Sequence, residues 1–306
     1  MRSTLIRGAG PTLLVAAGLL GAGNAQARIV INEVHYHPSN AAVQAGEDAE
    51  GLQFIELHND GPGAADLSRA SFTQGVTFSF PAGTSLDVGG YLIVAQDPTL
   101  LALRGPVIPN GVQVFRWASG ILANGGETIR LADAAGSLLD EVTYDDAGLW
   151  PAAADGLGSS LELTNPAYDN AWPLAWRASA DVNGTPGARN SAFTEAPIVL
   201  SETPTRGSIG DAPAEISVTF AAPVSGVVAG DLVVDGSAAT AVSCGACAGG
   251  VGAGPWVFSG FAVPHSNPFV VTLGPGAIQD QQARPFAGDD WRLTLSVPRV
   301  VINEVH

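Results

Sequence analysis

Turn-forming sequences recur at short intervals along most of this chain and separate short apolar runs. Examples are residues 60–63 (DGPG), 123–126 (ANGG) and 133–136 (DAAG). Glycine accepts positive φ and proline fixes φ, and the 38 Gly and 21 Pro supply such turns throughout. The apolar runs between the turns have the length of strands, and none shows a sustained helical period. The chain is therefore predicted to be all-β, as a sandwich or a barrel.

The composition excludes several classes of protein. Charged residues make up 14% and hydrophobic residues 46%, which is too apolar for a disordered chain. The formal net charge is -16, so binding of nucleic acid through a basic face is not expected. All thirteen basic residues are Arg, which excludes mechanisms that need a lysine Schiff base or a phosphate-binding lysine. No Gly-x-Ser-x-Gly motif occurs either. We expect a protein that is not an enzyme and needs no cofactor.

The N-terminus has the pattern of a secretory signal peptide. Arg2 and Arg7 precede a short apolar run at residues 13–20, and Ala25-Gln26-Ala27 is a small-x-small cleavage site. The run is much shorter than the ~20 apolar residues that a membrane span requires. We expect residues 1–27 to be removed and the mature chain to be secreted or held at the cell surface without a transmembrane span. Removal of the two Arg changes the net charge from -16 to -18.

A heptapeptide near the start of the mature chain recurs at its end. Residues 29–35 read IVINEVH and residues 300–306 read VVINEVH. Internal repetition of this kind indicates modular construction. It predicts that one module starts near residue 28 and that residues 298–306 are the first strand of a second, truncated copy.

A second unit is predicted after a linker at residues 191–197. Within residues 198–297, Ile216, Val218 and Phe220 alternate in a strand pattern, and Asp235-Gly236 is typical of a tight hairpin turn. About a hundred residues with seven strands suit an immunoglobulin-like sandwich. In the first unit, residues 98–104 (PTLLALR) have the pattern of one or two helical turns.

A series of short motifs runs through residues 28–190 in a fixed order. They are Ile31-Asn32-Glu33-Val34, Phe54-Ile55-Glu56-Leu57, Gly89-Gly90-Tyr91-Leu92-Ile93-Val94, Asn124-Gly125-Gly126-Glu127, Asp140-Glu141-Val142-Thr143-Tyr144, Ser160-Leu161-Glu162-Leu163 and Gly184-Thr185-Pro186-Gly187. In order and spacing the series resembles the lamin tail domain of secreted bacterial proteins. Residues 198–297 are similar, more loosely, to bacterial immunoglobulin-like domains. Together the two resemblances imply two immunoglobulin-like β-sandwiches in tandem.

The resemblance also implies a function. Such domains are extracellular, non-catalytic modules for tethering or interaction, with an unknown extracellular protein or a glycan as partner. An alternative is the N-terminal, non-catalytic part of a larger secreted enzyme, such as a spore-coat-type kinase, a nuclease or a phosphatase. His35-Tyr36-His37-Pro38 is similar to the form of the domain that precedes spore-coat-type kinases.

Histidines and glutamates on two early strands form the candidate metal site. Alternation puts Glu33, His35 and His37 on one face of a strand, and Glu56 and His58 on one face of the next. If the strands pair, imidazoles and carboxylates suited to zinc or another divalent ion converge. The alternative is a solvated polar face with no metal.

Two further features are candidate sites. Cys244 and Cys247 form a single C-x-x-C in a glycine-rich loop, and the predicted oxidising compartment favours a local disulfide over a redox or zinc motif. Trp172 and Trp176 lie in a segment rich in Pro and Asn and are candidate ligand contacts. Exposed tryptophans that stack on sugars would make the chain a carbohydrate-binding module, whereas buried ones would belong to the cores.

Overall fold

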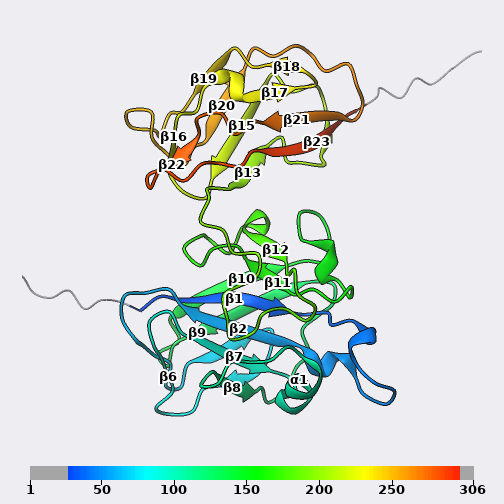
Figure 1. Cartoon of the computed structure of the whole chain (residues 1–306), viewed down its shortest axis with the longest axis vertical. Helices are drawn as coiled ribbons and strands as arrows, with labels where there is room; N and C mark the ends of the chain where they lie inside the picture. Colours follow the sequence, from blue (N-terminus) through cyan, green and yellow to red (C-terminus); the bar gives the residue numbers. More distant parts are fainter. Residues whose placement is uncertain (1–26, 297–306) are drawn as a thin grey trace, which may run out of the picture.

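Two β-sandwiches follow one another along the chain, and Figure 1 shows them as two lobes joined by a short connection. The computed structural model describes residues 27–296. The predicted strand at residues 298–306, and all of the predicted signal peptide except Ala27, lie outside the described residues. The all-β prediction, with two immunoglobulin-like sandwiches in tandem, is confirmed.

The first sandwich consists of a six-stranded and a four-stranded sheet. The larger sheet has the order β12 (Trp176–Ala178), β11 (Leu161–Leu163), β1 (Ile29–His35), β2 (Phe54–Asn59), β7 (Tyr91–Ala95) and β8 (Gln113–Arg116). The smaller has the order β10 (Leu138–Tyr144), β9 (Glu127–Ala132), β4 (Ser71–Gln74) and β5 (Phe78–Ser79). The short strands β3 (Ala65–Asp66) and β6 (Ser85–Leu86) form a separate pair. Only β7 and β8 pair in parallel among these strands.

The core of the first sandwich lies between its two sheets. Ile31, Leu57 and Leu92 pair across β1, β2 and β7 and point inward, towards Ile129 and Val142 of the opposite sheet. These side chains are almost completely buried. Residues on alternate positions of the larger sheet therefore face away from this core.

The outer face of the larger sheet is covered as well. Helix α1 (Pro98–Arg104) begins at Asp97, whose side chain accepts hydrogen bonds from the Thr99 and Leu100 backbone amides. Leu101 of this helix packs with Phe54 and other apolar residues of the outer face. Short 3₁₀ helices η1 (Asn40–Ala42), η2 (Ala49–Leu52), η3 (Ala152–Ala154) and η4 (Pro173–Ala175) lie in the connections.

The second sandwich pairs a four-stranded with a five-stranded sheet. The first has the order β13 (Val199–Thr203), β15 (Glu215–Phe220), β20 (Trp256–Ser259) and β19 (Ala241–Ser243). The second has the order β14 (Ile209–Gly210), β23 (Asp289–Leu295), β21 (Phe269–Leu273), β17 (Leu232–Val234) and β18 (Ser237–Ala238). Strands β16 (Val224–Ser225) and β22 (Gln279–Asp280) form a small pair, and η5 (Ala229–Asp231) precedes β17. The predicted alternation in β15 is seen, since Ile216, Val218 and Phe220 are all buried.

The two sandwiches contact each other through apolar residues. Leu174 packs into the core cluster of the second sandwich, and Leu200 packs into that of the first. Within residues 27–296 no helix has the length and apolar character needed to cross a membrane.

Candidate functional site

Three buried glutamates lie side by side on the outer face of the larger sheet in the first sandwich. Glu33 of β1 pairs with Glu56 of β2 on one side and with Glu162 of β11 on the other. Their side chains are completely buried. We call Glu33, Glu56 and Glu162 the buried glutamate row. Carboxylates at this depth require hydrogen-bond donors, because an unpaired buried charge is costly.

A β-bulge in β1 brings the row into register. The pairing of β1 with β2 shifts between Ile31 and Glu33, so that Asn32 is the extra residue. Asn32 and Glu33 therefore both reach the outer face, although they are consecutive. The Asn32 side-chain amide donates to Glu56 Oε1 at 2.8 Å and to Asn190 Oδ1 at 2.9 Å.

Donors to the row come from a segment that crosses the outer face. We call residues 184–192 the closing segment. Glu33 Oε1 accepts hydrogen bonds from the Thr185 backbone amide at 2.9 Å and from the Ser160 hydroxyl at 2.6 Å. Glu56 Oε2 accepts one from the Gly187 backbone amide.

Glu162 anchors both ends of the closing segment. Its Oε1 accepts a hydrogen bond from the Thr185 hydroxyl at 2.7 Å. Its Oε2 accepts bonds from the Ser191 hydroxyl at 2.8 Å and from the Ala192 backbone amide at 2.7 Å. The row therefore fixes the closing segment to the sheet, although the segment lies about 150 residues after β1 in the sequence. The attached segment completes the outer face of the sandwich.

Glycine is required where the closing segment first meets the row. Gly184 has φ +81, and a Cβ atom there would collide with Glu33 Oε1 and lie 2.5 Å from Ser160 Oγ. Both the positive φ and the close approach exclude a side chain at this position.

Burial also affects the protonation of Glu33 and Glu56. Desolvation raises the pKa of Glu33 well above its ordinary value, and the neighbouring charge of Glu56 raises it further. Desolvation raises the pKa of Glu56 to about 8. No Arg or His within residues 27–296 forms an ion pair with any member of the row. Glu33 and Glu56 are consequently held partly protonated near neutral pH.

The histidines of the predicted metal site do not join the glutamates. His35 packs its ring against Phe54, with ring centroids 5.6 Å apart, and burial lowers its pKa to about 4. His58 stacks on Tyr91 at 4.5 Å. His37 lies beyond the end of β1, and its Nδ1 is 2.6 Å from Asp155 Oδ1.

The prediction of a metal site formed by Glu33, His35, His37, Glu56 and His58 is therefore wrong. Within the described part of the chain, no group of three or more His, Cys, Asp or Glu side chains is arranged to hold a metal ion. The strands do pair, and Glu33 and Glu56 do meet. The reason for the failure is that both carboxylates are engaged by the closing segment, whereas the imidazoles pack on aromatic rings or leave the strand.

The predicted tryptophan pair does not form an exposed ligand surface. Trp176 is 1% exposed, packs in the core beside Trp150 and donates its indole N–H to the Asn170 carbonyl at 2.8 Å. Trp172 is 42% exposed. The prediction of a ligand contact is therefore wrong for Trp176, which is a core residue, whereas for the exposed Trp172 it stays a prediction.

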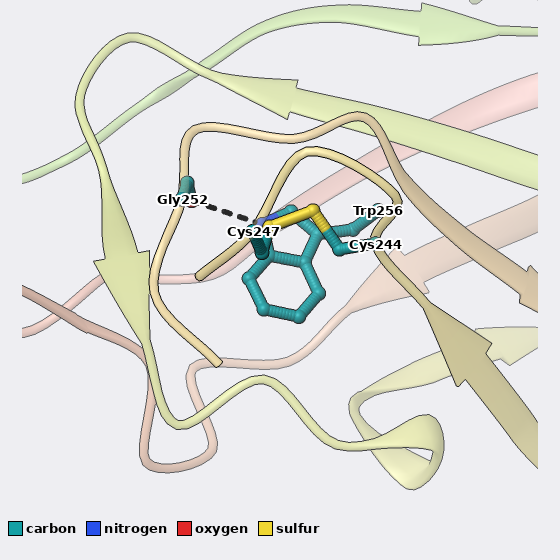
Figure 2. The surroundings of a disulfide bond; sticks show 4 residues. All are labelled: Cys244, Cys247, Gly252 and Trp256. Atoms are coloured by element: carbon teal, nitrogen blue, oxygen red, sulfur yellow. Dashed lines mark hydrogen bonds between the residues drawn. A yellow bond between two sulfur atoms is a disulfide. The ribbon is translucent and has the colours of Figure 1, made fainter. Parts of the chain in front are cut away.

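Cys244 and Cys247 are joined by a disulfide in the second sandwich. Figure 2 shows the bond beside Trp256, whose indole N–H donates to the Gly252 carbonyl at 3.1 Å. Both cysteines pack against the core cluster that contains Trp256. The indole hydrogen bond ties the glycine-rich loop to β20, and the disulfide closes a short turn within that loop.

Several residues of the site are absent from the predicted set. Asn32, Ser160, Glu162, Thr185 and Asn190 all participate in the network around the row. Ser160, Glu162 and Thr185 do belong to the motifs that carry the family resemblance. Those motifs therefore contained the signal: the Ser-Leu-Glu-Leu and Gly-Thr-Pro-Gly sequences are distant in the chain and contact each other in the fold.

The fold and the row define an immunoglobulin-like β-sandwich that encloses three glutamates on the outer face of its larger sheet. Residues 22–146 match the family model of the Lamin Tail Domain. The match covers less than half of the chain and ends just after β10, so the closing segment lies outside it. No curated protein matches the chain.

Proposed function

We propose that this chain is a non-catalytic, extracellular or cell-surface module that binds or tethers other molecules. The observation that carries the proposal is the enclosure of the buried glutamate row. Paired carboxylates serve acid–base catalysis when substrate can reach them. Here Glu33, Glu56 and Glu162 are completely buried, and each accepts hydrogen bonds from the closing segment. These carboxylates therefore serve as hydrogen-bond acceptors that hold the closing segment on the sheet.

Other features support an exported interaction module. The lamin tail domain is an immunoglobulin-like sandwich, and its match to residues 22–146 is compatible with such a role. The signal-peptide pattern and the Cys244–Cys247 disulfide are both consistent with an oxidising compartment. The acidic net charge favours solubility and repels anionic surfaces, so the partner is expected to be neutral or basic.

Export and attachment are tested on the tagged full chain in the cell that produces it. We expect N-terminal sequencing to give a mature protein that begins at Arg28, found in the envelope or the medium. Binding of the purified mature chain to isolated envelopes is expected to be saturable and to be displaced by unlabelled chain. Retention in the cytoplasm with residues 1–27 intact, or binding that does not saturate, would overturn the proposal.

A variant of the row tests the non-catalytic part. Glu56→Gln keeps the size of the side chain and its ability to accept a hydrogen bond while removing its ionisation. We expect the variant to bind envelopes as the parent does. If the parent converts any envelope component and a folded Glu56→Gln variant does not, the row is catalytic and the proposal fails.

A second candidate is the non-catalytic N-terminal region of a larger secreted enzyme. The recurrence of residues 29–35 at residues 300–306 favours it, because a repeat indicates further modules. The genomic reading frame is the test. An in-frame catalytic domain downstream supports this candidate, and a stop codon after His306 contradicts it.

A further inference from the structure

A cleft lies at the junction of the two sandwiches, and residues of both sandwiches line it. We call it the junction cleft. The first sandwich contributes Leu149, Pro151 and Arg177 to its walls, and the second contributes Arg206 and Arg292. Its volume is about 560 Å³, within the range of about 300–1,000 Å³ that is usual for small-molecule sites. Such sites occur preferentially where two domains meet.

Arg177 of β12 reaches the cleft with a guanidinium that is oriented by the fold but only partly used. Its Nη1 donates to the carbonyls of Leu174 and Trp176, both at 2.8 Å. Within residues 27–296 its Nε and Nη2 donate to no group, and it forms no ion pair. The residue is exposed to solvent. The edge formed by Nε and Nη2 matches a carboxylate, which accepts two parallel hydrogen bonds from it.

The charge of Arg177 also lacks the compensation that the neighbouring Arg206 has. Arg206 donates from Nε to Glu202 and from Nη2 to Asp289, each at 2.8 Å. Desolvation lowers the pKa of Arg177 below its ordinary value, and this effect outweighs the opposing charge of Asp289. The charge of Arg206 lowers the pKa of Arg177 further. A carboxylate bound to Arg177 would supply the missing negative charge.

Two exposed charges of β23 complete the polar lining. Neither Arg292 nor Asp290 forms an ion pair or a side-chain hydrogen bond with another described residue. The lining therefore contains three arginines and one aspartate, and Glu202 and Asp289 already neutralise Arg206. This balance suits a ligand with one negative charge better than a polyanion. The negative net charge of the chain is screened over about 8 Å at physiological ionic strength, so it acts weakly on a small ligand in contact with Arg177.

The rest of the lining is largely apolar. Leu149 and Pro151 are partly exposed and offer apolar surface that a ligand can cover. Leu174 and Trp291 also line the cleft and are almost completely buried. A ligand with an apolar part gains from removing the surface of Leu149 and Pro151 from water, whereas a fully hydrophilic ligand does not.

We propose that the junction cleft binds a small apolar monocarboxylate, whose carboxylate accepts hydrogen bonds from Nε and Nη2 of Arg177 and whose apolar part covers Leu149 and Pro151. Arg292 adds attraction for the negative charge. Two sources share this chemistry, namely a free aliphatic or aromatic acid and the carboxyl terminus of a peptide that ends in an apolar residue. The inference goes beyond the proposed function, because it assigns a small-molecule site to the module.

The test is titration calorimetry of the full chain with N-acetylphenylalanine, which represents a peptide terminus, and with phenylacetate, which represents a free acid. We expect saturable binding of at least one of them, and the tighter one identifies the source. N-acetylphenylalaninamide keeps the apolar part without the charge, and acetate keeps the carboxylate without the apolar part. Both are expected to bind at least about tenfold more weakly. The methyl NMR signals of Leu149 should shift in proportion to the bound acid.

Substitutions of Arg177 test the assigned contact. Arg177→Gln should raise the Kd about tenfold or more, and Arg177→Lys should restore only part of the loss because lysine keeps the charge without the two parallel bonds. Arg116→Gln is the matched control, since Arg116 is an exposed arginine that lines a different pocket, and it should keep the Kd of the parent. Thermal unfolding verifies that each variant is folded.

Four results would overturn the proposal. They are no binding of either acid, equal binding of N-acetylphenylalanine and its amide, equal binding by a folded Arg177→Gln variant and the parent, and binding that leaves the Leu149 signals unchanged. The comparison of the acid with its amide uses the parent chain alone, so it decides the question even if Arg177→Gln does not fold. The envelope assay needs no small ligand, and its outcome is therefore independent of this test.

Discussion

The substitution Gly184→Ala tests how strongly the closing segment is held by the buried glutamate row. The new methyl group would occupy the space of Glu33 Oε1 and approach Ser160 Oγ to 2.5 Å. It would therefore displace the carboxylate from the hydrogen bonds donated by Ser160 and Thr185. The backbone would also be forced to hold alanine at φ +81.

Two terms contribute to the expected loss of stability. A residue other than glycine at positive φ costs about 1 kcal/mol. Disruption of two buried hydrogen bonds to a carboxyl group costs about 1–3 kcal/mol each, with partial relaxation of the site. We expect Gly184→Ala to lower the free energy of unfolding of the first sandwich by about 3–5 kcal/mol in total.

Gly83 provides a matched control in the same sandwich. Its φ is +84, and no atom lies within 4 Å of a Cβ atom built on it. Gly83→Ala therefore carries the cost of positive φ alone, about 1 kcal/mol. Unfolding in urea is followed by hydrogen exchange and mass spectrometry. Peptides from β1 and β2 monitor the first sandwich, and peptides from β21 and β23 monitor the second.

The expected difference between the two variants is about 2–4 kcal/mol, confined to the first sandwich. Equal losses in Gly184→Ala and Gly83→Ala would show that the contacts of Gly184 with the row contribute nothing. A loss located in the second sandwich would equally refute the reasoning.

Three other predictions concern charge, the disulfide and the tryptophans. Because folding raises the pKa of Glu56 from 4.5 to about 8, its contribution to stability is complete below pH 4.5 and is lost as the pH rises through 8. The urea concentration at the unfolding midpoint of the first sandwich should therefore decrease when the pH is raised from about 6 to about 9, and Glu56→Gln should make this decrease smaller. A midpoint of the parent that does not change with pH would contradict this. Replacing Cys244 and Cys247 by Ser should lower the free energy of unfolding of the second sandwich by about 2 kcal/mol, since the disulfide closes a loop with a sequence separation of only 3. A loss above twice that value would argue against a purely local role of the disulfide. In thermal or urea unfolding, Trp176→Ala should lower the free energy of unfolding by about 3–5 kcal/mol and Trp172→Ala by less than about 1 kcal/mol. Similar losses in the two variants would refute the assigned burial.

Much of the fold follows from local sequence signals. The turn at residues 133–136 joins β9 to β10, and Asp235-Gly236 joins β17 to β18, as their composition predicts. The helical pattern at residues 98–104 is helix α1. These elements depend on turn chemistry and short-range periodicity, which a single sequence records directly.

Several strands have too weak a local signal to be predicted, and β4 and β12 are the two of them that are longer than two residues. β4 (Ser71–Gln74) contributes only Phe72 to the buried side, so its pattern is too weak to indicate a strand. β12 (Trp176–Ala178) follows a segment rich in Pro and Asn and gains its strand conformation from pairing with β11. In both segments the strand conformation results from pairing with a neighbouring strand and not from the local sequence.

The site was only partly predictable. Alternation correctly put Glu33 and His35 on one face of β1, and the pairing with Glu56 is present. The bulge at Asn32 could not be inferred, because alternation assigns Asn32 to the face opposite Glu33. The bond from Asn32 to Asn190 spans 158 residues, and no local pattern encodes such a contact.

Hydrogen exchange of the native chain tests the central claim that the buried glutamate row is a structural element enclosed by the closing segment. The backbone amides of Thr185, Gly187 and Ala192 donate to Glu33, Glu56 and Glu162. We predict that these amides exchange as slowly as those of β1 and β2, through global unfolding of the first sandwich. Exchange at the rate of an exposed loop would mean that the carboxylates are open to solvent, and it would contradict both the structural role and the non-catalytic function proposed from it.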